Sequence, residues 1–183
     1  MNELNCTPWP RACLQVYTGT GKGKTTAALG LSVRAAGRGM KVFIGQFMKG
    51  SEYGELKGIP MLGDLVHVEQ FGSPECIPLR EEPAPRDTAL ARKGLERIRE
   101  VIGSRDYQIV VLDEVNVAVH FKLIDEVDLL ALVDARPPDV EIICTGRYAP
   151  ETLIERADLV TEMRAVKHPY DTTGLLARDG IER

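Results

Sequence analysis

Residues 17–26 read Tyr17-Thr18-Gly19-Thr20-Gly21-Lys22-Gly23-Lys24-Thr25-Thr26. The apolar residues at 14–17 resemble the end of a buried strand, and Ala27-Ala28-Leu29 resemble the first turns of a helix. In a glycine-rich turn of this kind the backbone N–H groups point into one concavity, and the helix N-terminus adds partial positive charge. The stretch therefore predicts a phosphate-binding loop between a strand and a helix.

Two side chains of the loop have a predicted role. Lys24 is expected to reach the outer phosphates of a nucleotide, and the Thr25 hydroxyl to hold a magnesium ion. Against the pattern G-x-x-x-x-G-K-[ST], the first glycine comes one position late, so an ordinary flexible turn is the alternative reading. The residues predicted to bind the nucleotide are Gly19, Thr20, Gly21, Lys22, Gly23, Lys24, Thr25 and Thr26.

A second informative stretch ends in two carboxylates. Residues 107–112 form an apolar strand-like run that leads into Asp113 and Glu114. Such a strand is the usual partner of a phosphate loop, because one acid can bind the metal and the other can hold its water shell or polarise water. The alternative is a strand followed by a helix-capping acid. We predict Thr25 and Glu114 as first metal ligands, with Asp113 in second place.

A third polar position follows another strand-like run at residues 140–145. Arg147 lies just beyond this run, where a guanidinium group can grip a phosphate with two parallel hydrogen bonds. A surface salt bridge explains the same arginine equally well, and the sequence does not separate the two readings.

Composition limits the classes of protein that fit. The 183 residues suffice for a single domain over 1–183 with a full core, which begins with a loose arm at 1–11. The net charge of −4 argues against a nucleic-acid coat protein, and the longest apolar runs are too short to span a membrane. Cys13 and Cys144 lie in strand-like runs as reduced core thiols would, which favours the cytoplasm.

The remaining segments predict an α/β sheet with helices on both faces. We expect strands at 12–18, 41–47, 65–71, 107–114, 140–145 and 159–163, and helices at 24–37, 86–102, 125–135 and 151–157. Residues 48–61 are expected to form an irregular loop beside the site, and residues 72–85 a surface loop or lid. Gly103 is expected to cap the long helix. The tail, 164–183, mixes charges with glycines near the predicted site.

Five short stretches together carry a more specific resemblance. They are residues 18–28, the run Gln46-Phe47-Met48-Lys49-Gly50, residues 112–116, Thr145-Gly146-Arg147, and residues 161–171 with Val166-Lys167-His168-Pro169-Tyr170-Asp171. From about residue 13 onward the chain closely resembles the ATP:corrinoid adenosyltransferase family of the P-loop NTPase, RecA-like type. The late first glycine is what that family shows.

The resemblance implies an enzyme that moves the 5′-deoxyadenosyl group of ATP onto cobalt(I) of a reduced corrinoid and releases triphosphate. It implies Mg²⁺, with Lys24, Lys22 and Glu114 as the catalytic residues and Arg147 assisting. It also implies a homodimer, a reducing flavoprotein as partner, and a corrinoid held by apolar and aromatic groups.

The corrinoid contacts are where this sequence departs from the family. The aromatic pair of well-known members has no clear equivalent in residues 71–79, where Phe71 and Ile77 are the only candidates. Two other functions share the predicted magnesium site: a P-loop ATPase or small-molecule kinase, and a non-catalytic nucleotide or corrinoid carrier.

Overall fold

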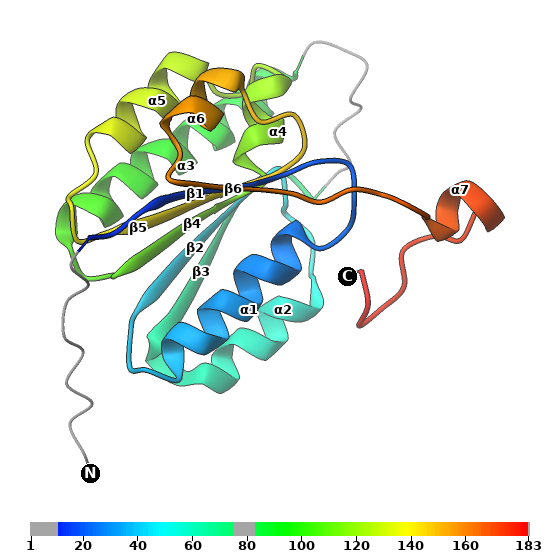
Figure 1. Ribbon diagram of the computed structural model, residues 1–183, viewed down its shortest axis with the longest axis horizontal. Coiled ribbons are helices and arrows are strands. Elements are labelled where there is room, and N and C mark those ends of the chain that lie inside the picture. The colour runs from blue at the N-terminus through cyan, green and yellow to red at the C-terminus, as the bar shows by residue number, and fades with distance from the viewer. Residues whose placement is uncertain (1–10, 75–82, 183) are drawn as a thin grey trace.

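The computed structural model of the protein describes residues 11–74 and 83–182, and Figure 1 shows its layers. The strands are β1 (Leu14–Thr18), β2 (Val42–Phe47), β3 (Val66–Phe71), β4 (Ile109–Asp113), β5 (Glu141–Thr145) and β6 (Leu159–Glu162). The helices are α1 (Lys24–Ala36), α2 (Gly54–Gly58), the 3-10 helix η1 (Ile59–Leu65), α3 (Pro85–Ser104), α4 (Val115–His120), α5 (Glu126–Asp134), α6 (Glu151–Arg156) and α7 (Pro169–Thr173).

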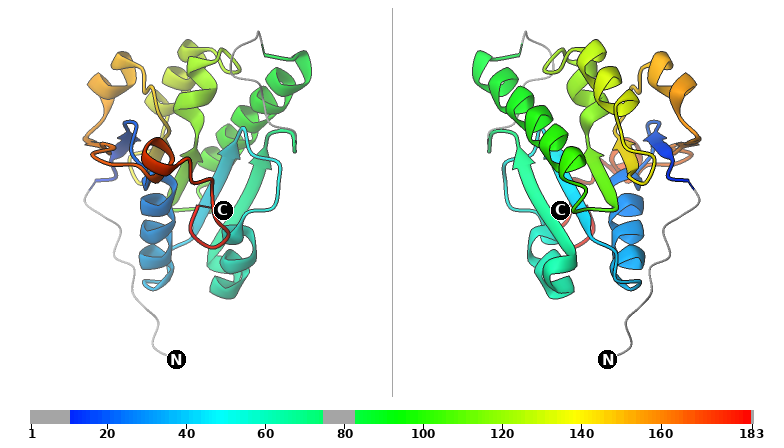
Figure 2. Two further views of the ribbon diagram at one scale, coloured as in Figure 1. Left: turned by 90° about the vertical axis from the view of Figure 1, so that its right-hand side faces the viewer. Right: turned by 90° about the vertical axis from the view of Figure 1, so that its left-hand side faces the viewer.

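The strands join in one sheet with the order β3-β2-β4-β5-β1-β6. All of its neighbouring strands run parallel, so the α/β fold of the P-loop type is confirmed, with a wholly parallel sheet. Helices α3 to α6 cover one face, and α1 and α2 cover the other (Figures 1 and 2). The carboxyl ends of the strands therefore meet at one edge, which is where ligands bind in such sheets.

Buried strand residues alternate between two hydrophobic cores. In β4, for example, Val110 and Leu112 face the core under α3 to α6, whereas Ile109 and Val111 face the core under α1. This alternation follows from the two-residue period of a strand that is covered on both faces. A sheet buried in this way is rigid, and it fixes where each strand ends.

Two sequence expectations about local structure are wrong. Residues 48–61 are not wholly irregular, because α2 and the start of η1 lie among them; Ile59 is buried there, and the left-handed Gly63 (φ 66°) interrupts η1. Gly103 does not cap the long helix, which continues to Ser104, and Arg105 takes the left-handed conformation instead (φ 60°). Glycines in the sequence suggested an irregular backbone at 48–61 and a helix end at Gly103, but packing in the folded chain allows helix at both places.

Some expected segments lie outside the described residues, and two further observed helices were not expected. Most of the N-terminal arm, most of the expected loop or lid, and Ile77 lie outside the described residues. Helices α4 and α7 were not predicted, because neither segment is long enough to show a helical period. None of the helices in the described ranges is long and apolar enough to cross a lipid bilayer.

The contact between α3 and β3 gives a direct test of the packing. A Cβ added at Gly94 would lie 2.5 Å from Cγ of Phe71, whereas a Cβ added at Gly30, on the exposed side of α1, would meet nothing within 4 Å. We expect Gly94→Ala to lower the free energy of unfolding by about 1–3 kcal/mol. Gly30→Ala should raise it by about 0.5–1 kcal/mol, because alanine favours the helix.

Urea unfolding of the two variants measures this difference. Gly30→Ala is the matched control, because it is the same substitution inside a helix without the steric clash. An unfolding midpoint for Gly94→Ala at or above that of the unaltered chain would contradict the described packing of α3 against Phe71.

Candidate active site

The phosphate loop lies between β1 and α1 and packs closely against the chain that follows β6. The amide of Gly21 donates to the carbonyl oxygen of Met163 at 2.6 Å. A Cβ at Gly19 would lie 2.5 Å from that same oxygen, and Gly19 and Gly23 have positive φ values of 93° and 117°. The glycines are therefore required both by the backbone conformation and by the contact with Met163.

Lys24 lies inside the loop. Its Nζ donates to the carbonyl oxygens of Gly19, at 2.8 Å, and Gly21, at 2.7 Å, and its side chain is buried. Burial lowers the pKa of Lys24, and the carboxylate of Glu114 offsets part of that effect. The Lys24 ammonium group is thus held in the loop by neutral carbonyl acceptors. An anionic ligand is a stronger acceptor for this group and can replace them.

Asp113 gathers the polar side chains at the centre of the strand ends. Its Oδ1 accepts from the hydroxyls of Thr25, at 2.9 Å, and Thr145, at 2.7 Å, and its Oδ2 accepts from Lys49 Nζ at 2.9 Å. Gln46 also donates to Oδ2 at 3.3 Å. Asp113 is only 1% exposed, so this network joins the ends of β2, β4 and β5 to the first turn of α1.

Glu114 follows in a left-handed conformation (φ 62°), which turns the chain sharply into α4. Its amide donates to the Thr145 hydroxyl at 3.0 Å, and its side chain lines a cavity together with the phosphate loop. Burial, and then the neighbouring Asp113, raises the pKa of Glu114. A cation at this position would therefore be stabilised by two adjacent carboxylates in a partly dehydrated site.

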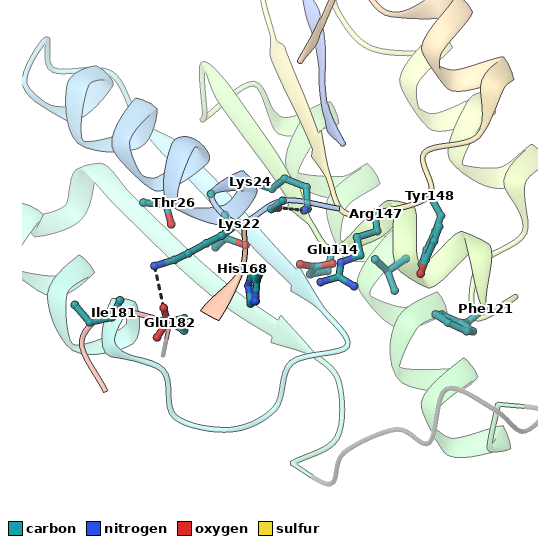
Figure 3. A pocket seen from close by; sticks show the side chains of 14 residues that line it. Lys22, Lys24, Thr26, Glu114, Phe121, Arg147, Tyr148, His168, Ile181 and Glu182 are labelled. Atoms are coloured by element: carbon teal, nitrogen blue, oxygen red, sulfur yellow. Dashed lines mark hydrogen bonds and ion pairs between the residues drawn. The ribbon is translucent and has the colours of Figure 1, made fainter. Parts of the chain in front are cut away.

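The cavity has a volume of about 540 Å³ and extends along the carboxyl edge of the sheet. Figure 3 shows Lys22 and Thr26 at one end, Tyr148 and Phe121 at the other, and Glu114 between them. Arg147 also lines the central part, beyond Gly146, whose carbonyl oxygen accepts from Asn116 at 3.1 Å.

A second, larger cavity of about 870 Å³ adjoins the first. It is lined by five cationic side chains and by apolar residues of the tail. The cationic residues are Lys22, Arg147, Arg164, Lys167 and Arg178, and the apolar ones include Leu175 and Leu176. Four side chains border both cavities, namely Lys22, Arg147, His168 and Glu182. Most of the residues that line this second cavity lie between Arg164 and Glu182.

The site lies in a chain that has well-defined relatives. Residues 10–183 match the family model described as ATP:corrinoid adenosyltransferase BtuR/CobO/CobP. The chain belongs to the ATP:corrinoid adenosyltransferase family.

Three curated corrinoid adenosyltransferases show the extent of the similarity. The protein of Sinorhizobium sp is 38% identical over 170 residues, which cover 91% of this chain and 78% of that protein. The protein of Pseudomonas aeruginosa is 36% identical over 173 residues, covering 94% of this chain and 84% of that protein. The protein of Escherichia coli (strain K12) is 34% identical over 173 residues, covering 94% and 86%.

The structure brings most of the predicted site residues of this adenosyltransferase family member together. Residues Gly21 to Thr26, Glu114 and Arg147 line the first cavity, and Thr20 lines the second. Lys22 points toward the tail, where its Nζ lies 3.3 Å from Glu182 Oε1. The contact places Lys22 at the boundary of the two cavities.

Phe71, which we expected to contact the corrinoid, lies in the core of this structure. The residue is 8% exposed, and its ring packs against Phe47 with a centroid distance of 5.6 Å. The ring also fills the space beside Gly94 of α3. Phe71 thus packs in the core under α3, and its contact with a corrinoid stays a prediction.

Lys49 is a site residue that the predicted set omitted. Besides Asp113, its Nζ contacts Glu55 Oε1 at 3.4 Å, and its side chain is 14% exposed. Burial alone would lower the pKa of Lys49, but the charge of Asp113 and the hydrogen bond to it raise it overall. The signal in the sequence was its place in the run Gln46-Phe47-Met48-Lys49-Gly50 after a strand, which by itself does not indicate a partner.

Removing Lys49 tests this buried network. We expect Lys49→Met to lower the free energy of unfolding by about 3 kcal/mol, because it leaves Asp113 and Glu55 as neighbouring buried carboxylates without a counter-charge. Lys57→Met is the matched control. Lys57 pairs with Glu52 at the surface, where both side chains are more than 70% exposed, and its loss should cost less than about 0.5 kcal/mol.

Urea unfolding with and without MgCl₂ measures both effects. Magnesium should recover part of the stability of Lys49→Met, because a divalent cation replaces the missing positive charge, and should leave the Lys57→Met difference unchanged. Equal unfolding midpoints for the two variants would contradict a buried role for Lys49.

Proposed function

We propose that this chain transfers the 5′-deoxyadenosyl group of ATP to cobalt(I) of a corrinoid and releases triphosphate. The observation that supports it most directly is the phosphate loop of a corrinoid adenosyltransferase family member, with Lys24 and Thr25 at a cavity that also contains Glu114 and Arg147. The loop supplies a binding site for the triphosphate, and the open cavity beside it leaves room for the rest of the nucleotide.

The chemistry requires charge stabilisation rather than a general base. Cobalt(I) donates an electron pair to C5′ of the ribose, a cobalt–carbon bond forms, and the C5′–O bond breaks with its electrons going to the departing triphosphate. Negative charge then grows on the phosphates. Lys24, Lys22 and the loop amides lie where they can stabilise it, and Arg147 lines the same cavity.

The residues present also fit a magnesium ion. Mg²⁺ prefers oxygen donors, and the Thr25 hydroxyl, Asp113 and Glu114 supply a hydroxyl and two carboxylates next to the phosphate loop. When bound, the ion would neutralise charge on the triphosphate. Thr25 and Glu114, which both line the cavity, are the first ligands proposed, and Asp113, which accepts a hydrogen bond from the Thr25 hydroxyl, comes second.

The second cavity is the proposed seat of the corrinoid. It is larger than the first and combines the apolar Leu175 and Leu176 with cationic groups, which suits a large ring with polar side arms. Because Lys22 and Arg147 border both cavities, a corrinoid there would lie next to the nucleotide. The homodimer, the reducing flavoprotein and the cytoplasmic location remain predictions.

Lys24→Ala should abolish adenosylation, because it removes the cation that the phosphate loop places at the phosphates. The assay combines ATP, Mg²⁺ and chemically reduced cob(I)alamin, and follows the light-sensitive adenosylated product and the released triphosphate. Lys93→Ala is the control, because Lys93 is exposed on α3.

Full activity of Lys24→Ala would exclude the phosphate loop from the reaction. Release of ADP or inorganic phosphate instead of triphosphate would indicate an ATPase or kinase, and binding without turnover would indicate a carrier.

The metal ligands can be tested separately from the loop. Asp113→Asn and Glu114→Gln should each raise the Mg²⁺ concentration for half-maximal nucleotide binding by about tenfold or more, because a neutral amide is a weaker ligand than a carboxylate. Glu155→Gln, an exposed change on α6, should leave it unchanged. A Mg²⁺ dependence that is the same in all three variants would disprove the assignment.

A further inference from the structure

Three aromatic rings gather at the end of the first cavity that lies away from Lys22. Tyr148 stacks on His120 with a centroid distance of 4.2 Å and an interplanar angle of 24°. Phe121 meets His120 edge-on at 4.9 Å and Tyr148 edge-on at 6.4 Å. Tyr148 and Phe121 both line the cavity, and Figure 3 shows them across Glu114 from Lys22 and Thr26.

The backbone at Tyr148 is held in an unfavourable conformation. Its φ of 61° is left-handed, which a bulky side chain rarely adopts, and 50% of the residue is exposed, so burial offers little compensation. The neighbouring chain holds it there: Asn116 fixes the carbonyl of Gly146, and the amide of Ala149 donates to the Thr18 hydroxyl at 3.4 Å. Strain of this kind concentrates at ligand-binding positions.

The two ends of the cavity differ in chemistry. One end offers the amides and lysines of the phosphate loop, and the other offers a half-exposed tyrosine ring backed by the His120 ring, with Phe121 and Val117 alongside. The two ends of a nucleoside triphosphate differ in a matching way. Its phosphates are anionic, and its base is a flat π-system that stacks on aromatic side chains.

We propose that Tyr148, supported by His120, is the stacking platform for the adenine base of ATP. The inference rests on the proposed function, since it takes the phosphates to lie in the loop. Adenine fits better here than the corrinoid because these rings share one cavity of about 540 Å³ with the phosphate loop, whereas the corrinoid is assigned to the adjoining cavity of about 870 Å³. Tyr148 thereby sets the position of the base and hence the direction in which C5′ points.

Isothermal titration of the full chain with MgATP and with magnesium tripolyphosphate tests the platform. Tyr148→Gly is the decisive variant, because it removes the ring and also relieves the left-handed strain, so the fold should be at least as stable. Its affinity for ATP should fall about tenfold, as expected for loss of base stacking, while its affinity for tripolyphosphate stays unchanged. Tyr148→Phe should bind ATP as the unaltered chain does.

Other outcomes separate this proposal from the proposed function. Unchanged ATP affinity in Tyr148→Gly, or an equal loss for ATP and tripolyphosphate, would each overturn the platform. Lys24→Ala should weaken both phosphate ligands. If Lys24→Ala weakens the binding of neither ligand, the proposed phosphate-binding site is wrong, whatever the result for Tyr148→Gly.

Discussion

The buried carboxylate of Asp113 holds the site together. Its two oxygens accept hydrogen bonds from Thr25, Thr145, Gln46 and Lys49, which come from three segments of the chain: the first turn of α1, the end of β5, and the end of β2 with the loop after it. A carboxylate that is almost fully removed from water must be paired with a cation or with hydrogen-bond donors. This requirement fixes the position of each partner side chain. The relative positions of the phosphate loop, the β5 turn and the loop after β2 therefore depend on one charged group.

Sharp turns at the strand ends complete this arrangement. The first residue after each of four strands is left-handed: Gly19 after β1, Met48 after β2, Glu114 after β4 and Gly146 after β5. These four strands are consecutive in the parallel sheet, in the order β2-β4-β5-β1, so their turns bring side chains from distant parts of the sequence to one edge. Two of the turns use non-glycine residues, Met48 and Glu114, and this local strain is concentrated where the ligands are proposed to bind.

Much of the fold could be predicted because its signals are local. The glycine-rich loop, the apolar strand before Asp113 and the long amphipathic helix each show their period or composition within a few residues, and the structure confirms those elements. What depends on tertiary contact could not be predicted in this way. Lys49 becomes a buried partner of Asp113 only once β2 lies beside β4, and Phe71 enters the core only because Gly94 makes room for its ring.

The site residues show the same division. The sequence places Lys24, Thr25 and Asp113 near one another, because the loop and the acidic strand end have recognisable patterns. The aromatic group of His120, Phe121 and Tyr148 has no such pattern, since it combines the end of a short unpredicted helix with the turn after β5. Only the folded sheet shows that these segments are neighbours.

The wall shared by the two cavities has a thermodynamic consequence. Lys22, Arg147, His168 and Glu182 border both spaces, and Glu182 already contacts Lys22. A ligand that draws any of these groups toward one space changes the free energy of filling the other. By linkage, the factor by which the first occupant alters the affinity for the second equals the factor in the reverse direction. If the two substrates occupy these two cavities as proposed, any coupling between their binding is reciprocal, in either order of arrival.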